Sequence, residues 1–72
     1  MIKIEVGSLW ADKDPREAGR TVRVLVPPRY EGDFLHCQVV TLRGGREPSY
    51  PKTTAIRAGS FRERFRQVEE TG

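Results

Sequence analysis

Hydrophobic and polar residues alternate along much of the chain, and this period of two is typical of strands that bury one face. The strongest signal is a pair of runs, residues 21–26 and 34–42, which are separated by the turn-forming segment 27–33. The β-branched residues of both runs favour the pleated surface of a sheet. We therefore predict two antiparallel strands whose inward side chains are Val22, Val24, Val26, Leu35, Cys37 and Val39.

Two shorter runs precede this pair. Residues 1–6 alternate so that Ile2, Ile4 and Val6 share one face, which predicts a first strand. Residues 9–11 are either a short second run or the same strand continued past a bulge. The strand at 1–6 is also the one that we expect at an edge of the sheet.

The last third of the chain predicts two more strands, at 53–57 and 66–69, with a short helical turn between them. Ser60 is placed to cap that turn. Phe61 and Phe65 are four residues apart and therefore share one of its faces. A turn this short is not stable by itself and needs the rest of the domain to pack against.

Five short strands, a long polar loop after the first, a tight hairpin and one helical turn before the last strand resemble the SH3-like small barrel of SH3, Tudor and KOW-type modules. The predicted fold is all-β: a five-stranded SH3-like barrel in a single domain, residues 1–70, with a frayed C-terminus at 71–72. Closing so short a sheet buries its inner face and removes exposed edges. An OB-fold is the structural alternative, but it usually needs more residues.

A closer resemblance rests on residues 7–16, which read Gly-Ser-Leu-Trp-Ala-Asp-Lys-Asp-Pro-Arg, and on 19–24, which read Gly-Arg-Thr-Val-Arg-Val. With Thr-Ala-Ile-Arg at 54–57 and Phe61, they are similar to a group of short actinobacterial and actinophage proteins with a Trp-Ala-Asp-x-Asp-Pro-Arg opening. The resemblance implies a fold and a bacterial or phage setting, and it supplies no catalytic residues. The proline-containing loops depart from that pattern, which leaves their lengths open.

The composition and length of the chain limit the classes of function that it can have. A chain of 72 residues, 36% of them hydrophobic, needs nearly all of its apolar side chains for the core. We expect no enzyme, no small-molecule substrate and no cofactor, because a barrel this small is filled by its own side chains. Cys37 is the only cysteine and cannot form an internal disulfide. One Cys and one His, His36, are too few ligands for a structural zinc site. We therefore expect Cys37 to be a small buried hydrophobic residue. No apolar run is long enough to cross a membrane and no leader opens the chain, which predicts a cytoplasmic protein.

The net charge of +3 comes from 13 basic and 10 acidic residues, which are interspersed along the chain. Ten of the basic residues are Arg and three are Lys. Arg suits bidentate contacts with phosphate or carboxylate groups. A GC-rich genome would produce the same bias without any functional meaning, so the charge alone leaves the partner open.

The first hypothesis is nucleic-acid binding by the outward face of the sheet. Outward positions on adjacent strands would form a polar stripe, flanked by a strand start and by the Gly44-Gly45 hairpin tip. These residues are Arg20, Arg23, His36, Gln38, Arg43, Arg46 and Arg57. The stripe would neutralise phosphates while Tyr30 or Tyr50 stacked on bases. The alternative for these residues is an ordinary solvated strand face balanced by acidic side chains.

The second hypothesis is a protein-interaction module that uses a groove beside the long first loop, with a cellular or phage-host protein as its partner. Its candidate residues are Trp10, Asp12, Asp14, Glu17, Tyr30 and Tyr50. The aromatic rings would accept an extended chain, and the acids would select a basic one. Trp10 can instead lie half-buried at the barrel seam, and Asp12 and Asp14 can cap turns and pair with a nearby Arg. The acidic spacing does not match a calcium loop, so we expect no metal site. Self-association through the edge at 1–6 is a third option.

Overall fold

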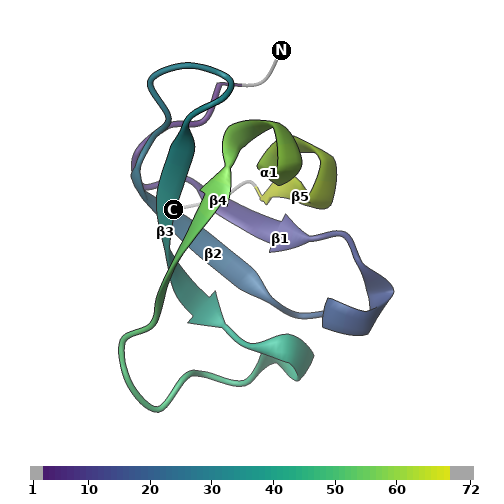
Figure 1. The fold of residues 1–72 in the computed structure, drawn as a ribbon. Helices are drawn as coiled ribbons and strands as arrows, with labels where there is room; N and C mark the ends of the chain where they lie inside the picture. The colour runs from purple at the N-terminus through teal and green to yellow at the C-terminus, as the bar shows by residue number, and fades with distance from the viewer. Residues whose placement is uncertain (1–2, 69–72) are drawn as a thin grey trace.

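The computed structural model describes residues 3–68, which contain five strands in one antiparallel sheet (Figure 1). The strands are β1 (Leu9–Asp12), β2 (Thr21–Val26), β3 (Phe34–Thr41), β4 (Thr53–Arg57) and β5 (Phe65–Val68). A helix, α1 (Ala58–Arg64), precedes β5, and single turns of 3-10 helix, η1 (Pro15–Glu17) and η2 (Arg43–Gly45), lie in two of the loops. The predicted all-β class with one short helix before the last strand is confirmed.

The strands lie in the order β4-β3-β2-β1-β5, so the last strand returns to pair with the first. Leu9 lies opposite Val68, and Asp12 lies opposite Phe65. Within residues 3–68, β4 and β5 are the two edges of the sheet, and α1 lies between them (Figure 1).

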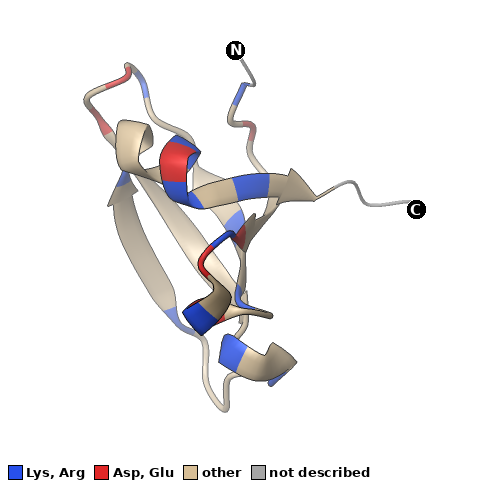
Figure 2. Cartoon of the chain, turned by 90° about the vertical axis from the view of Figure 1, so that its right-hand side faces the viewer, with Lys and Arg blue, Asp and Glu red and all other residues tan. Residues whose placement is uncertain are grey.

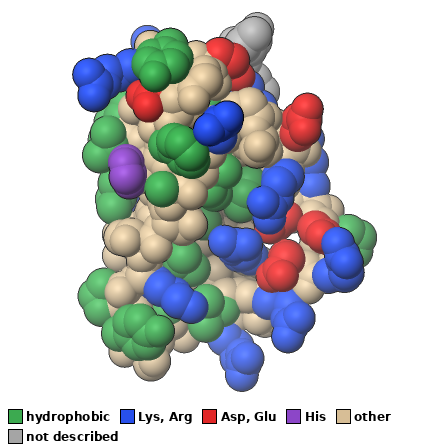
Figure 3. Space-filling view, viewed as in Figure 1, with side chains coloured by type: hydrophobic (Ala, Val, Ile, Leu, Met, Phe, Trp, Pro, Cys, Tyr) green, Lys and Arg blue, Asp and Glu red, His purple; other side chains and the backbone are tan. Residues whose placement is uncertain are grey.

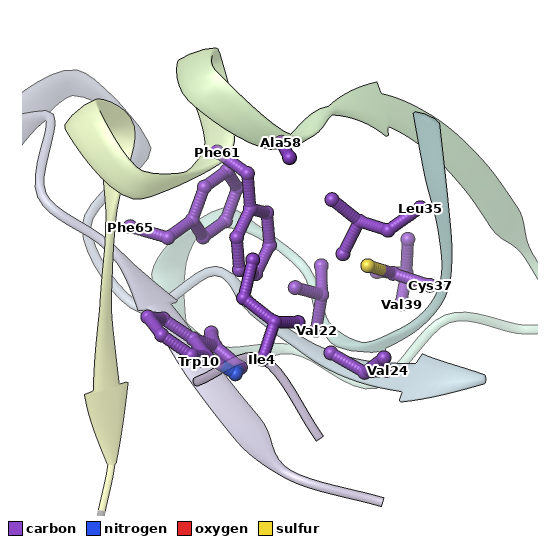
Figure 4. Close-up of a cluster of buried hydrophobic side chains, with 10 residues drawn as sticks. All are labelled: Ile4, Trp10, Val22, Val24, Leu35, Cys37, Val39, Ala58, Phe61 and Phe65. Atoms are coloured by element: carbon purple, nitrogen blue, oxygen red, sulfur yellow. The ribbon is translucent and has the colours of Figure 1, made fainter. Parts of the chain in front are cut away.

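The core lies on the concave side of the sheet, under α1 (Figure 4). The ring of Phe61 meets Trp10 edge-on and stacks on Phe65, with centroids 4.9 Å apart in both pairs. The other buried hydrophobic side chains of this cluster are Ile4, Val22, Val24, Leu35, Cys37, Val39 and Ala58. The predicted alternation in β3 is therefore confirmed, because its inward positions are all buried.

Helix α1 is stabilised by packing rather than by a cap. Arg57 is its N-cap residue, and no side chain of the described residues caps its first turn. Ser60 lies inside the helix and is exposed, so its predicted capping role is wrong. Ala58 and Phe61 are fully buried instead, and burial of a Phe side chain contributes about 1.5–3 kcal/mol.

The segment before β1 is not a strand, so the predicted strand at 1–6 is wrong over its described part. Ile4 is buried as expected, but Val6 is 65% exposed. The chain turns at this point, because Ser8 N–H donates to Glu5 O and Gly7 has a φ of 84°. Ile2 lies outside the described residues. The edges of the sheet are β4 and β5, and the first strand, β1, is an interior strand, which corrects the expected edge.

A β-bulge at the end of β2 corrects the predicted orientation of Val26. Val24 lies opposite Cys37 and Val26 lies opposite His36, so β2 has one residue more than β3 between these two pairs. Val26 is consequently turned outward and is 52% exposed, next to Leu25 at 42%. The strand expected at 34–42 ends at Thr41, and the one expected at 66–69 begins at Phe65. The frayed end predicted at 71–72 lies outside the described residues, as do residues 69 and 70.

Candidate nucleic-acid interface

Two loops meet at the end of the sheet where β1 ends, β2 begins and β3 ends. We call this the loop corner and define it as residues 13–20 and 42–46 (Figure 2). Gly44 N–H donates to Ala18 O at 2.7 Å. Gly19 has a φ of 92°, and a Cβ built on it would lie 2.6 Å from Gly45 N. Because only glycine fits that contact, the two backbones are held directly against each other.

Each loop has its own internal hydrogen bonds. Asp14 Oδ1 accepts from Arg16 N–H at 2.9 Å and so caps η1, which Pro15 begins. In the second loop, Leu42 N–H donates to Arg46 O at 2.6 Å and Gly45 N–H donates to Leu42 O at 2.9 Å. The predicted tight turn at Gly44-Gly45 is therefore present. It is followed by an irregular segment, 47–52, before β4 begins.

Basic side chains gather at the loop corner from both loops and from the end of α1. Lys13 N–H donates to Arg64 O at 2.8 Å, which places these two residues side by side. Arg43 and Arg46 lie at the two ends of the Gly44-Gly45 turn, and both are exposed. Figure 3 shows these loops at its lower right, where blue side chains crowd together with red ones between them. Within residues 3–68, no ion pair involves Lys13, Arg43, Arg46 or Arg64.

Two other cations of the corner are paired with acids. Arg16 Nη2 lies 3.0 Å from Asp14 Oδ2, and this hydrogen bond lowers the pKa of the Asp14 carboxyl. The side chain of Asp12 is fully buried, and its Oδ2 lies 3.6 Å from Arg20 Nη1. The expected pairing of these acids with nearby Arg residues is confirmed. Arg20 is therefore part of the structure of the corner, and its guanidinium also lies 5.9 Å from the centre of the Phe65 ring.

The predicted outer stripe is present as a set of positions but is interrupted by apolar side chains. Arg23 lies opposite Gln38, on the outer face of β2 and β3. His36 is exposed, but it lies between Val26 and Ala55. Arg57 lies opposite Phe34, and its guanidinium is 5.0 Å from the centre of that ring. The polar and apolar groups of this face thus alternate along β3.

A groove lies where the segment 47–51 folds over this outer face. Its volume is about 490 Å³, and its lining includes Arg23, Gln38, Glu47 and Tyr50. Arg23 Nη1 donates to Gly7 O at 2.7 Å, which holds the guanidinium across the sheet. Arg23, Gln38 and Tyr50 all belong to the predicted nucleic-acid surface, and Tyr50 was also a candidate for a protein partner, but the groove that brings them together was not predicted. The prolines on either side of Tyr50 were the available signal, because they stiffen the segment that carries this ring.

Within residues 3–68, the side chains predicted to bind a protein partner do not come together in one groove. Trp10 is only 2% exposed, and its Nε1–H donates to Ser8 Oγ at 2.9 Å. It is neither half-buried at a seam nor available for stacking. Asp12 is also buried, and its Oδ1 accepts from Asp14 N–H. Tyr30 and Tyr50 are both exposed, but they lie in the loops at opposite ends of β3. Asp14 and Glu17 do lie in the first loop as expected.

Three further findings concern chemistry. Cys37 is fully buried, and burial raises the pKa of its thiol to about 11, although the charge of Arg20 opposes this shift. Among the described residues, no group of three or more His, Cys, Asp or Glu side chains is placed to hold a metal ion. The one α-helix of the described residues, α1, has seven residues and is too short to cross a bilayer.

Comparisons of the chain with models of known protein families, with curated proteins and with solved structures found no match.

Proposed function

We propose that the chain is a non-enzymatic, cytoplasmic module that binds nucleic acid through the phosphate backbone, using the loop corner. The observation that carries the proposal is the convergence of Lys13, Arg43, Arg46 and Arg64 at one end of the sheet, with no ion pair to an acid of residues 3–68. Phosphates that are neutralised by such side chains release counterions, which supplies most of the affinity for a charged polymer.

The rigidity of the corner supports the same proposal. The contact between Gly19 and Gly45 and the hydrogen bond from Gly44 to Ala18 fix the spacing of the two loops before any ligand arrives. A surface that is already ordered loses less conformational entropy on binding than a flexible one. The pairing of Arg16 and Arg20 with acids leaves the outer cations as the groups that contact the ligand.

The test is a titration of fluorescently labelled DNA and RNA oligonucleotides at several salt concentrations. We expect binding that weakens steeply between about 50 and 200 mM salt. The double variant R43A/R46A should reduce the slope of log K against log salt by about 1 for each residue that contacts a phosphate. The control is K3A/R29A, which removes the same charge at the opposite end of the sheet, where Arg29 lies between β2 and β3 and Lys3 lines a pocket with Pro27 and Pro28. Absence of binding at low salt, or an affinity that is indifferent to salt, would refute the proposal.

A protein partner is the second candidate, and the bulge at the end of β2 favours it. Val26 is 52% exposed and Phe34 is 47% exposed, and both lie at the end of the sheet remote from the loop corner. Exposed apolar side chains that cluster in this way are typical of interaction surfaces. The partner in this reading is a cellular or phage-host protein. Capture of one stoichiometric protein from nuclease-treated bacterial lysate, lost in V26S, would favour this candidate over nucleic acid.

A further inference from the structure

The groove on the outer face adjoins the loop corner through the chain itself. The connection from β3 to β4 carries Arg43 and Arg46 first and the groove segment, 47–51, directly afterwards. Arg46 and Tyr50 are four residues apart, so their Cα atoms are separated by at most about 14 Å. A ligand whose backbone lies on the corner can therefore reach the groove within a short stretch.

The lining of the groove combines a flat ring with hydrogen-bonding groups. Tyr50 is 62% exposed, and Pro48 and Pro51 stand on either side of it. Gln38 contributes an amide that both donates and accepts, and Glu47 contributes an acceptor. The volume of about 490 Å³ lies within the range of roughly 300–1,000 Å³ that is usual for small-molecule sites.

This combination of groups is the one by which proteins hold an unpaired nucleotide. Bases of single strands stack on aromatic side chains and present their Watson–Crick edges to polar groups. In a duplex the same faces are covered by neighbouring base pairs. Gln38 and Arg23 lie across from each other in the sheet and both line the groove, so the amide of Gln38 is a polar group beside the segment that carries the ring.

We propose that this groove takes an unpaired base of a single-stranded nucleic acid whose phosphates lie on Arg43 and Arg46. The inference rests on the proposed function and adds to it the preferred form of the ligand and a second contact. Tyr50 stacks on the base, and Gln38 contacts its edge. The same chain therefore binds single strands more tightly than duplexes of equal length.

The experiment compares a single-stranded oligonucleotide with a duplex of the same length and labels. We expect Tyr50→Ala to weaken single-strand binding by about 5- to 150-fold, which corresponds to roughly 1–3 kcal/mol for one stacked base. The duplex affinity and the salt slope should not change. Tyr30→Ala is the matched control, because Tyr30 is equally exposed, at 68%, but lies in the loop at the other end of β3.

The outcomes separate this inference from the proposed function. If Tyr50→Ala binds single strands as the unchanged protein does, or if the duplex binds more tightly, the groove is not a base site. Salt-dependent binding that is lost in R43A/R46A would still support the loop corner in that case. If neither oligonucleotide binds at low salt, both proposals fail together. Circular dichroism confirms that each variant is folded before its affinity is interpreted.

Discussion

The contact between the two loops of the corner predicts that Gly19→Ala is strongly destabilising. Gly19 has a φ of 92°, a conformation that costs an L-residue about 1–2 kcal/mol. Its new Cβ would also meet Gly45 N at 2.6 Å and two atoms of Gly44 at 3.1 Å. All three are backbone atoms, so the loops have to separate.

The separation adds a second cost. The hydrogen bond from Gly44 N–H to Ala18 O, now 2.7 Å, is then lost, at about 0.5–1.5 kcal/mol. The expected total is about 1.5–3.5 kcal/mol. Gly7→Ala is the matched control, because Gly7 has a φ of 84° but nothing within 4 Å of the new Cβ. Its cost is the conformational part alone, about 1–2 kcal/mol.

Equilibrium unfolding in urea measures both variants. The reduced entropy of the unfolded chain on replacing Gly by Ala is common to the two, so it cancels in the comparison. With a slope of about 1 kcal/mol per M urea, Gly19→Ala should unfold at a midpoint roughly 1 M below that of Gly7→Ala. If the two variants agree to within about 0.5 kcal/mol, the loops are not held together as described, and the preorganised loop corner is refuted.

Two further predictions concern buried groups. In the same urea assay, Asp12→Ala should lower the free energy of unfolding by about 1–3 kcal/mol, because Asp14 N–H loses its acceptor and Arg20 loses its counter-charge. Asp12→Asn keeps an acceptor and should cost less. Equal losses in the two variants would contradict the role of Asp12 as an acceptor. The buried Cys37 thiol, with its pKa raised from 9.0 to about 11, keeps its proton longer in the folded protein than in the unfolded chain. Its contribution to stability is therefore complete below pH 9 and is lost as the pH rises toward 11, a decline that Cys37→Ala should lack. Rapid modification of Cys37 by a thiol reagent in the folded protein at pH 8 would contradict its burial.

The predictions that succeeded are those in which a pattern is reinforced by a neighbouring strand. In β3, Leu35, Cys37 and Val39 alternate with polar residues, and both adjacent strands pair with β3 in a matching register. Phe61 in α1 and Phe65 at the start of β5 likewise face the core, where their rings stack on each other. Local pattern and tertiary packing agree at these positions, so the sequence was sufficient.

The wrong predictions have physical causes that the alternation of hydrophobic and polar residues does not reveal. Residues 1–6 alternate, but the turn at Gly7 and the hydrogen bond from Ser8 to Glu5 prevent them from joining the sheet as a strand. The bulge beside Val26 depends on where β3 pairs, which no single run of residues specifies. Asp12 is a charged residue, so its type does not predict burial. It is buried where β1 pairs with β5 and where Arg20 lies beside its carboxylate.

The candidate site was predictable in its parts and not in its arrangement. Arg43 and Arg46 were predicted beside a tight turn, and Tyr50 was predicted to be a ring that stacks on a base. Their proximity to the first loop depends on the contact between Gly19 and Gly45, which joins segments far apart in the sequence. The outer face was expected to be a continuous polar stripe, and the apolar residues beside His36 divide it.

The most direct test of the central claim is to map amide chemical shifts by NMR during titration with a short single strand. The loop corner predicts the largest shifts at Lys13, at residues 42–46 and at Arg64, followed by Gln38 and Tyr50 in the groove. These shifts should disappear in R43A/R46A and reverse on addition of salt. Shifts that cluster instead around Val26 and Phe34, or none at saturating oligonucleotide, would contradict the account.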